Sequence, residues 1–182
     1  HGSLHGVFHA AGLQQWQDIS DAPGKAEQQL LQPKLAGAQA LADAWDDWQA
    51  ERPETPDLDF CVLMSSIAAD LGGLGYAYYS AANAALDAFA HQRFLQTGTN
   101  WLSIGWDAWR FDASGDSDWI DPDEGFDALE RVLDAMPCPR VVVSTTPLDA
   151  RLARWVNTQA YRAVEPVLAQ APTPINQQGM TE

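Results

Sequence analysis

Three polar side chains stand at spacings that suit acid–base chemistry. Ser66 follows the apolar run of residues 60–64, Tyr79 comes thirteen residues later, and Asn83 comes four residues after Tyr79. Residues four apart lie one turn apart on the same face of a helix, so Tyr79 and Asn83 can act together. A phenol has a pKa of about 10 and is a poor acid at neutral pH. A neighbouring cation would lower that pKa, while a serine hydroxyl could hold the substrate oxygen.

The segments around these residues predict how they are positioned. Residues 60–64 (FCVLM) have the length and composition of a strand buried on both faces of a parallel sheet. A glycine-rich turn follows at residues 71–75, and the Ala-rich residues 78–89 predict a helix. Ser66 therefore lies at the carboxyl end of a strand, where open α/β sheets bind their ligands.

The rest of the chain alternates between strand and helix patterns. Residues 25–48 have helical spacing interrupted at Pro33, and residues 46–58 are expected to form a surface loop. Asp121, Pro122 and Glu124 form a helix start, after which Phe126, Leu129, Val132 and Leu133 predict an amphipathic helix. Short buried strands are expected at residues 4–11, 100–106 and 140–144, and a closing helix at 148–156. The order predicts an α/β fold with a parallel sheet.

The spacing of Ser66, Tyr79 and Asn83 resembles that of the ketoreductase domains of modular polyketide synthases, a branch of the short-chain dehydrogenase/reductases. In that branch the usual Tyr-x-x-x-Lys becomes Tyr-x-x-x-Asn, and the lysine comes from an earlier helix. Further matches occur in the family's order between residue 4 and about residue 156: residues 6–12 (GVFHAAG), 33–38 (PKLAGA), 63–67 (LMSSI) and 102–109 (LSIGWDAW).

The resemblance implies a Rossmann-like, doubly wound parallel sheet, of which this chain holds the C-terminal portion, about strands 4 to 7. Residues 1–160 would be the reductase-like part and residues 161–182 a Pro/Gln-rich linker or tail. The implied activity is the NADPH-dependent reduction of a carrier-bound β-ketoacyl thioester to a β-hydroxyacyl thioester during polyketide biosynthesis. The implied partners are an acyl carrier protein with a phosphopantetheine-bound substrate and the N-terminal half of the reductase or adjacent synthase domains.

The resemblance also assigns roles. Tyr79 would donate the proton, and Ser66 would bind the ketone oxygen. Lys34 would lower the pKa of the tyrosine, and Asn83 would orient this network through hydrogen bonds. A lysine on such a helix is otherwise a solvated side chain, whereas the family match places Lys34 toward the tyrosine. His9 fits a packing role rather than catalysis. The residues expected to contact the cofactor are Ala10, Ala11, Gly12 and Trp106.

Residues 107–121 carry five aspartates and no regular period, which makes them a candidate lid. Trp106 and Trp109 would either form a wall of the active site or anchor this lid to the core. The family's stereochemical signature, a Leu-Asp-Asp element after the His-Ala-Ala-Gly motif, is replaced by residues 13–16 (LQQW). Because Trp16 could block one side of the groove, we expect the A-type alcohol.

A glycine-rich phosphate-binding turn is missing. The chain has no G-x-G-x-x-G motif, and the glycines at positions 72, 73 and 75 lie between the serine and the tyrosine rather than after a first strand. The cofactor-phosphate half is therefore expected outside this chain, as a separate chain or as part of a longer polypeptide, unless the site is vestigial. A structural, non-catalytic fragment packing against synthase domains is the alternative. Another short-chain dehydrogenase activity, an epimerase or alcohol dehydrogenase, is a third.

Composition excludes other classes of function. The formal charge of −15, from 25 acidic and 10 basic residues, disfavours nucleic acid and anionic lipid as partners. We expect no membrane association, because no apolar run reaches the roughly 18 residues of a spanning helix. The two cysteines, Cys61 and Cys138, form neither a disulfide framework nor a metal-ligand spacing, which fits a reducing, cytoplasmic setting without a bound metal.

Overall fold

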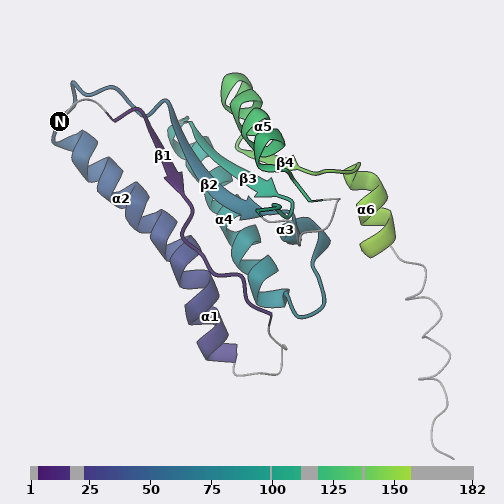
Figure 1. Cartoon of the computed structure of the whole chain (residues 1–182). Coiled ribbons are helices and arrows are strands. Elements are labelled where there is room, and N and C mark those ends of the chain that lie inside the picture. Colours follow the sequence, from purple (N-terminus) through teal and green to yellow (C-terminus); the bar gives the residue numbers. More distant parts are fainter. Residues whose placement is uncertain (1–3, 17–22, 99, 112–118, 137, 157–182) are drawn as a thin grey trace, which may run out of the picture.

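The computed structural model of the chain describes residues 4–16, 23–98, 100–111, 119–136 and 138–156. Its described residues form a four-stranded sheet in the order β1-β2-β3-β4, with every neighbouring pair parallel. The strands are β1 (Gly6–His9), β2 (Phe60–Ser66), β3 (Trp101–Trp106) and β4 (Arg140–Val143). Helices connect them and cover both faces (Figure 1). The predicted α/β fold with a parallel sheet is confirmed.

The register of the sheet places the ends of β2 and β3 side by side. Val62 pairs with Leu102, and Ser66 pairs with Trp106 at the carboxyl edge. Side chains alternate between the faces of a strand, so residues an even number apart share a face. Ser66 is the last residue of β2 and so lies at the carboxyl edge of the sheet, where ligands bind in such folds. Its neighbour β3 is buried along its whole length.

The helical segment between β1 and β2 is divided at Pro33, as expected. Helix α1 (Pro23–Leu31) and helix α2 (Gly37–Ala50) flank a π-helical segment, η1 (Gln32–Ala36), which contains Pro33. Proline lacks the N–H that an α-helix needs, and a wider turn accommodates it. Because α2 continues to Ala50, the loop expected from residue 46 begins only after Ala50. The buried Trp45 explains this correction, since its Nε1 donates a hydrogen bond to Asp57 Oδ1 at 3.1 Å and packs this last part of α2 on the core.

The segment after β2 forms a short helix and a long one. Helix α3 (Ala68–Leu71) begins directly after the strand, and helix α4 (Ala77–Thr97) extends well beyond the expected residues 78–89. The extension is held by Arg93, whose guanidinium pairs with Asp46 of α2 at 2.7 and 2.8 Å. Gly98, in the left-handed conformation with φ +63°, ends α4.

Helix α5 (Pro122–Ala135) starts at the predicted residue. Asp121 caps it and forms a capping box with Glu124. Phe126, expected on the buried face, is 61% exposed, because Trp109 fills the space at this first turn and Phe126 meets only its edge. Three other residues expected on that face do pack on the sheet: Leu129, Val132 and Leu133. Helix α6 (Leu148–Trp155) closes the described chain.

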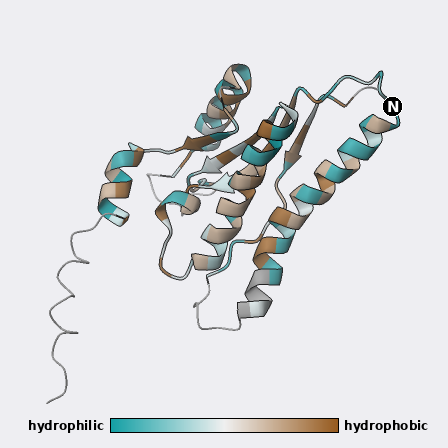
Figure 2. Cartoon of the chain, turned by 180° about the vertical axis from the view of Figure 1, so that it is seen from behind, coloured by the Kyte–Doolittle hydropathy of each residue, from teal (hydrophilic) through white to brown (hydrophobic). Residues whose placement is uncertain are grey.

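Two hydrophobic cores lie on opposite faces of the sheet. One joins the sheet to α2 and α4 and includes Leu63, Leu86 and Trp101. The other joins it to α5 and includes Val62 and Ile104. Figure 2, seen from the α2 and α4 side, shows hydrophobic residues along the strands behind these helices.

The proposed linker at residues 161–182 and residues 112–118 of the candidate lid lie outside the described residues. Within the part of the chain that the structure describes, no helix combines the length and the hydropathy that a bilayer span requires.

Candidate active site

The end of β2 is fixed by its two serines. Ser66 is partly buried, and its Oγ accepts a hydrogen bond at 3.2 Å from the backbone N of Ala68, the first residue of α3. Ser65 is buried on the other face, and its Oγ donates to the Asn83 carbonyl of α4 at 3.4 Å. These contacts hold β2, α3 and α4 together where the predicted catalytic residues lie.

Helix α4 presents Tyr79 and Asn83 at this edge. The Asn83 side chain is fully buried, and its Nδ2 donates to the Tyr79 carbonyl at 2.8 Å. Its Oδ1 accepts no hydrogen bond from the described residues, which leaves a buried acceptor inside the site. Tyr79 is partly exposed, and its ring packs against the edge of Tyr76 with centroids 5.9 Å apart.

Lys34 extends from η1 to the end of β2. Its side chain is 6% exposed, and its Nζ donates to the carbonyl of Met64, two residues before Ser66, at 2.8 Å. Burial lowers the pKa of Lys34 because desolvation disfavours the charged form, and the negative charge of Asp87 opposes this effect. The lysine therefore faces the sheet rather than solvent. Its approach to Tyr79 stays a prediction.

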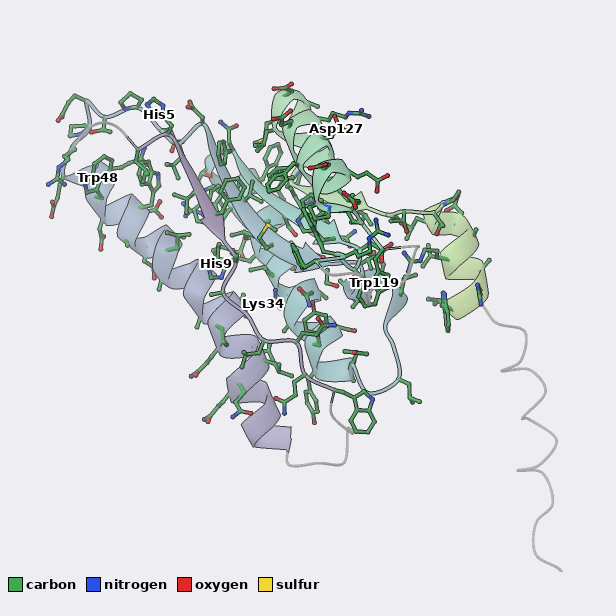
Figure 3. The ribbon with its side chains drawn as sticks, viewed as in Figure 1. His5, His9, Lys34, Trp48, Trp119 and Asp127 are labelled. Atoms are coloured by element: carbon green, nitrogen blue, oxygen red, sulfur yellow. The ribbon has the colours of Figure 1, made fainter. Side chains whose placement is uncertain are left out.

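His9 positions the backbone of Lys34. His9 Nε2 lies 3.0 Å from the Lys34 carbonyl, and because a carbonyl only accepts, Nε2 carries the proton and donates. Figure 3 shows both residues where β1 passes the helical segment that carries Lys34. A buried histidine committed to a backbone carbonyl fits the structural role expected for it.

Three of the residues expected to contact the cofactor lie on an exposed stretch of backbone. Ala10, Ala11 and Gly12 form an exposed stretch after β1, and a Cβ on Gly12 would lie 2.9 Å from Lys34 Cε. Glycine thus permits the backbone to pass close to the lysine. This open strand end beside Lys34 fits the nicotinamide end of a cofactor, while the phosphate-binding turn is absent from the sequence.

Two tryptophans, Trp106 at the end of β3 and Trp109 after it, are anchored to the core. Trp106 is 5% exposed, its ring packs edge-on against Trp109 at 5.0 Å, and its Nε1 has no partner among the described residues. Trp109 lies against Gly125 of α5, where a Cβ would overlap its ring. For Trp109 this geometry favours the anchoring role over the wall of a site. A cofactor contact of Trp106 stays a prediction.

The structure brings together the elements that carry Ser66, Tyr79, Asn83 and Lys34, yet the described hydrogen bonds include none between the Ser66 and Tyr79 hydroxyls. Catalytic hydrogen bonds often form only once substrate is bound. Among the described residues, no group of His, Cys, Asp or Glu could hold a metal ion.

One contact near the site was not anticipated from the sequence. Trp16 is 62% exposed, but its indole lies against Gly75 in the turn between Ser66 and Tyr79, where a Cβ would overlap the ring. Gly75 has φ +77°, which favours glycine on conformational grounds as well. The glycine-rich turn was visible in the sequence, but its packing partner was not.

A parallel sheet flanked by helices, with Ser66 at the end of β2 and Tyr79 and Asn83 on α4, has the architecture of the short-chain dehydrogenase/reductase class. The model of the KR domain family matches residues 1–111. The chain therefore belongs to the KR domain family, the ketoreductase domains of polyketide synthases.

Individual relatives agree with this family. The chain is 38% identical over 148 residues to a 6-methylsalicylic acid synthase from Penicillium terrestre, an alignment that covers 81% of this chain and 7% of the synthase. It is similar to the solved structure of the first ketoreductase of the tylosin synthase, with a TM-score of 0.67, 27% identity and coverage of 82% of this chain and 34% of that one. A solved A-type ketoreductase from a modular polyketide synthase gives a TM-score of 0.66 at 26% identity, covering 85% of this chain and 33% of that one. The chain thus spans a small part of the synthase and about a third of the solved ketoreductase chains.

Proposed function

We propose that this chain is the catalytic part of an NADPH-dependent reductase that converts a carrier-bound β-ketoacyl thioester to the β-hydroxyacyl thioester during polyketide biosynthesis. The observation that carries the proposal is the position of Lys34. A lysine from the segment before β2 is buried with its Nζ 2.8 Å from the Met64 carbonyl, two residues before Ser66. A buried lysine whose ammonium binds the backbone two residues before Ser66 is difficult to explain as packing alone.

In the proposed reaction, Tyr79 gives its proton to the ketone oxygen, and Ser66 donates a hydrogen bond to that oxygen. NADPH, when bound, would supply the hydride for the carbonyl carbon, and together with the proton from Tyr79 this would convert the ketone to the alcohol. Lys34 stabilises the phenolate that Tyr79 becomes, because opposite charge favours the ionised form. Asn83 fixes the first turns of α4 through its bond to the Tyr79 carbonyl and offers Oδ1 as an acceptor.

The residues after β1, Ala10 to Gly12, would lie along the nicotinamide end of the cofactor, with Trp106 supporting the floor at the end of β3. The phosphates would be held by residues outside this sequence. We assign residues 1–160 to the reductase domain and residues 161–182 to a linker. The partners in this proposal are an acyl carrier protein that brings the substrate on phosphopantetheine, and the remaining half of the reductase or adjacent synthase domains.

We also propose the A-type configuration for the alcohol. Support comes from Trp16, which packs on Gly75 beside the helix of Tyr79 and would narrow one side of the approach to the site. The 26% identity to a solved A-type ketoreductase is consistent with this assignment.

The test is reduction of a β-ketoacyl thioester surrogate by a preparation that contains this chain together with the cofactor-binding half. NADPH oxidation and formation of the β-hydroxy thioester, with slower turnover on NADH, are the expected results. A folded preparation that binds NADPH but does not reduce the thioester would overturn the proposal in favour of a structural, non-catalytic fragment.

A further inference from the structure

The start of β4 carries an arginine that joins two carboxylates from different elements. Arg140 Nε donates to Asp87 Oδ2 at 2.8 Å, and its Nη2 donates to Asp70 Oδ2 at 2.5 Å. The other oxygen of Asp87 accepts a hydrogen bond from Ser103 Oγ of β3. We refer to Arg140, Asp70 and Asp87 as the Arg140 clamp.

The clamp connects the two elements that carry the candidate catalytic hydroxyls. Asp70 lies in α3, the helix whose first residue, Ala68, donates a backbone hydrogen bond to the Ser66 hydroxyl. Asp87 lies in α4, eight residues after Tyr79 and so about two turns further along the same helix. Arg140 itself belongs to a strand two positions away from β2 in the sheet. One guanidinium thus ties the Ser66 side of the site to the Tyr79 side.

The segment between Ser66 and Tyr79 needs such a tie. Helix α3 has four residues, too few to be stable alone. Three glycines with positive φ follow it, at positions 72, 73 and 75, and glycine leaves a chain with the greatest conformational freedom. The Asp70 carboxylate, 23% exposed, gives α3 a charged side-chain bond to the rest of the fold.

The charges of Arg140 and the two carboxylates stabilise this arrangement. The Asp87 side chain is 8% exposed, and burial of an unpaired carboxylate is costly, so Arg140 is committed to it. Against the larger lowering caused by burial, the negative charge of Asp87 also raises the pKa of Lys34. The Asp70 bond is the more accessible arm of the clamp, and its removal leaves the Arg140–Asp87 pair intact.

We propose that Arg140 is a positioning residue: by holding Asp70 and Asp87 on one guanidinium, it fixes α3 against α4 and so sets the placement of Ser66 relative to Tyr79. This inference rests on the proposed function for its catalytic consequence. Its structural consequence is that the segment between Ser66 and Tyr79 is held in place, and this can be measured without an activity assay.

The test compares two variants that each remove one carboxylate charge. Asp70→Asn weakens the exposed arm of the clamp, while Asp127→Asn breaks the exposed pair of Asp127 with Arg131 on α5, far along the chain from the site. In the preparation that includes the cofactor-binding half, Asp70→Asn is expected to lower kcat between about 10- and 100-fold, the cost of a misplacement near 1 Å, with the KM for NADPH unchanged. Asp70→Glu, which retains the charge, is expected to recover part of kcat, and Asp127→Asn to leave it unchanged.

Amide hydrogen exchange supplies the second readout. In Asp70→Asn, amides of residues 67–76 are expected to exchange about tenfold faster, while those of β2 and β3 keep their rates, because one charged hydrogen bond restrains the segment locally. Equal acceleration throughout the chain, or no acceleration at residues 67–76, would overturn the clamp. Unchanged kcat in Asp70→Asn would overturn its catalytic role. If the wild-type preparation reduces no thioester, the proposed function fails, and the exchange measurement still decides the clamp.

Discussion

The Lys34 ammonium donates a hydrogen bond to the Met64 carbonyl across 2.8 Å, although the two residues are 30 positions apart in the chain. The contact joins η1 to β2 immediately before Ser66. Lys34 follows Pro33 directly within this π-helical segment and is its buried residue. The backbone of Lys34 is held in turn by His9 of β1. A cation is thereby brought to the strand end that carries the candidate serine.

Replacement of Lys34 should separate activity from stability. Lys34→Met keeps a long side chain and removes the charge, so ketone reduction is expected to fall by about two orders of magnitude if the cation supports proton transfer. The free energy of unfolding at neutral pH is expected to stay within about 1 kcal/mol of the wild type or to rise, because a buried charge no longer has to be desolvated. Enzyme assay and denaturant unfolding measure the two effects. Arg131→Met, which removes an exposed cation on α5, is the control, and full activity in Lys34→Met would contradict the assignment.

The same lysine predicts a pH dependence. Burial lowers the pKa of Lys34 from its ordinary value of 10.5, so the unfolded chain binds this proton more tightly than the folded chain does. The contribution of Lys34 is therefore destabilising at neutral pH and disappears as the pH rises toward 10.5. Relative to Lys34→Met, the wild type should gain stability as the pH increases in this range. A constant difference between the two proteins would show that the lysine is not desolvated.

Removal of the Tyr79 hydroxyl should abolish proton donation without unfolding the chain. Tyr79→Phe keeps the ring and its packing against Tyr76, and we expect a loss of reduction of about 100-fold or more, the contribution of a positioned general acid. Circular dichroism and thermal unfolding should match the wild type. Tyr76→Phe is the matched control on the neighbouring ring. Reduction at the wild-type rate by Tyr79→Phe would exclude it as the proton donor.

The indole of Trp16 should influence the configuration of the alcohol. Trp16→Ala removes the ring that lies on Gly75 and opens that side of the approach, so the product is expected to shift from predominantly A-type toward a mixture. Chiral chromatography of the β-hydroxy thioester measures this. Trp155→Ala, which removes another largely exposed tryptophan, should leave the ratio unchanged. An unaltered ratio in Trp16→Ala would show that the ring does not direct the substrate.

The two cysteines should differ sharply in reactivity. Burial raises the pKa of Cys61 to about 12, while Cys138 is exposed. A thiol reagent at mildly alkaline pH should therefore modify one cysteine in the native chain and both after denaturation. Because the Cys61 thiol ionises more readily in the unfolded chain, its contribution to stability falls as the pH rises from about 9 to about 12. Cys61→Ala should lack this decrease, and rapid native labelling of two thiols would contradict the burial of Cys61.

Local patterns in the sequence predicted most of the helices and strands and the spacing of the candidate site residues. Apolar runs marked β2 and β3, the capping box marked the start of α5, and the interval between Ser66 and Tyr79 together with Asn83 indicated the family. These signals are local, because strand burial, helix capping and helix spacing each depend on residues that are close together in the sequence. Even so, Phe126 was assigned to the wrong side, since the space at the first turn of α5 is filled by Trp109.

The contacts between these elements became known from the folded chain. The hydrogen bond of Lys34 to Met64, the indole of Trp16 on Gly75 and the ties from Arg140 to Asp70 and Asp87 all join distant parts of the chain. No periodicity encodes such pairs, because each depends on how separate helices and strands are brought together around the sheet. The sequence can thus name the reacting groups, while the groups that hold them in place emerge when the sheet has formed and its two faces are covered.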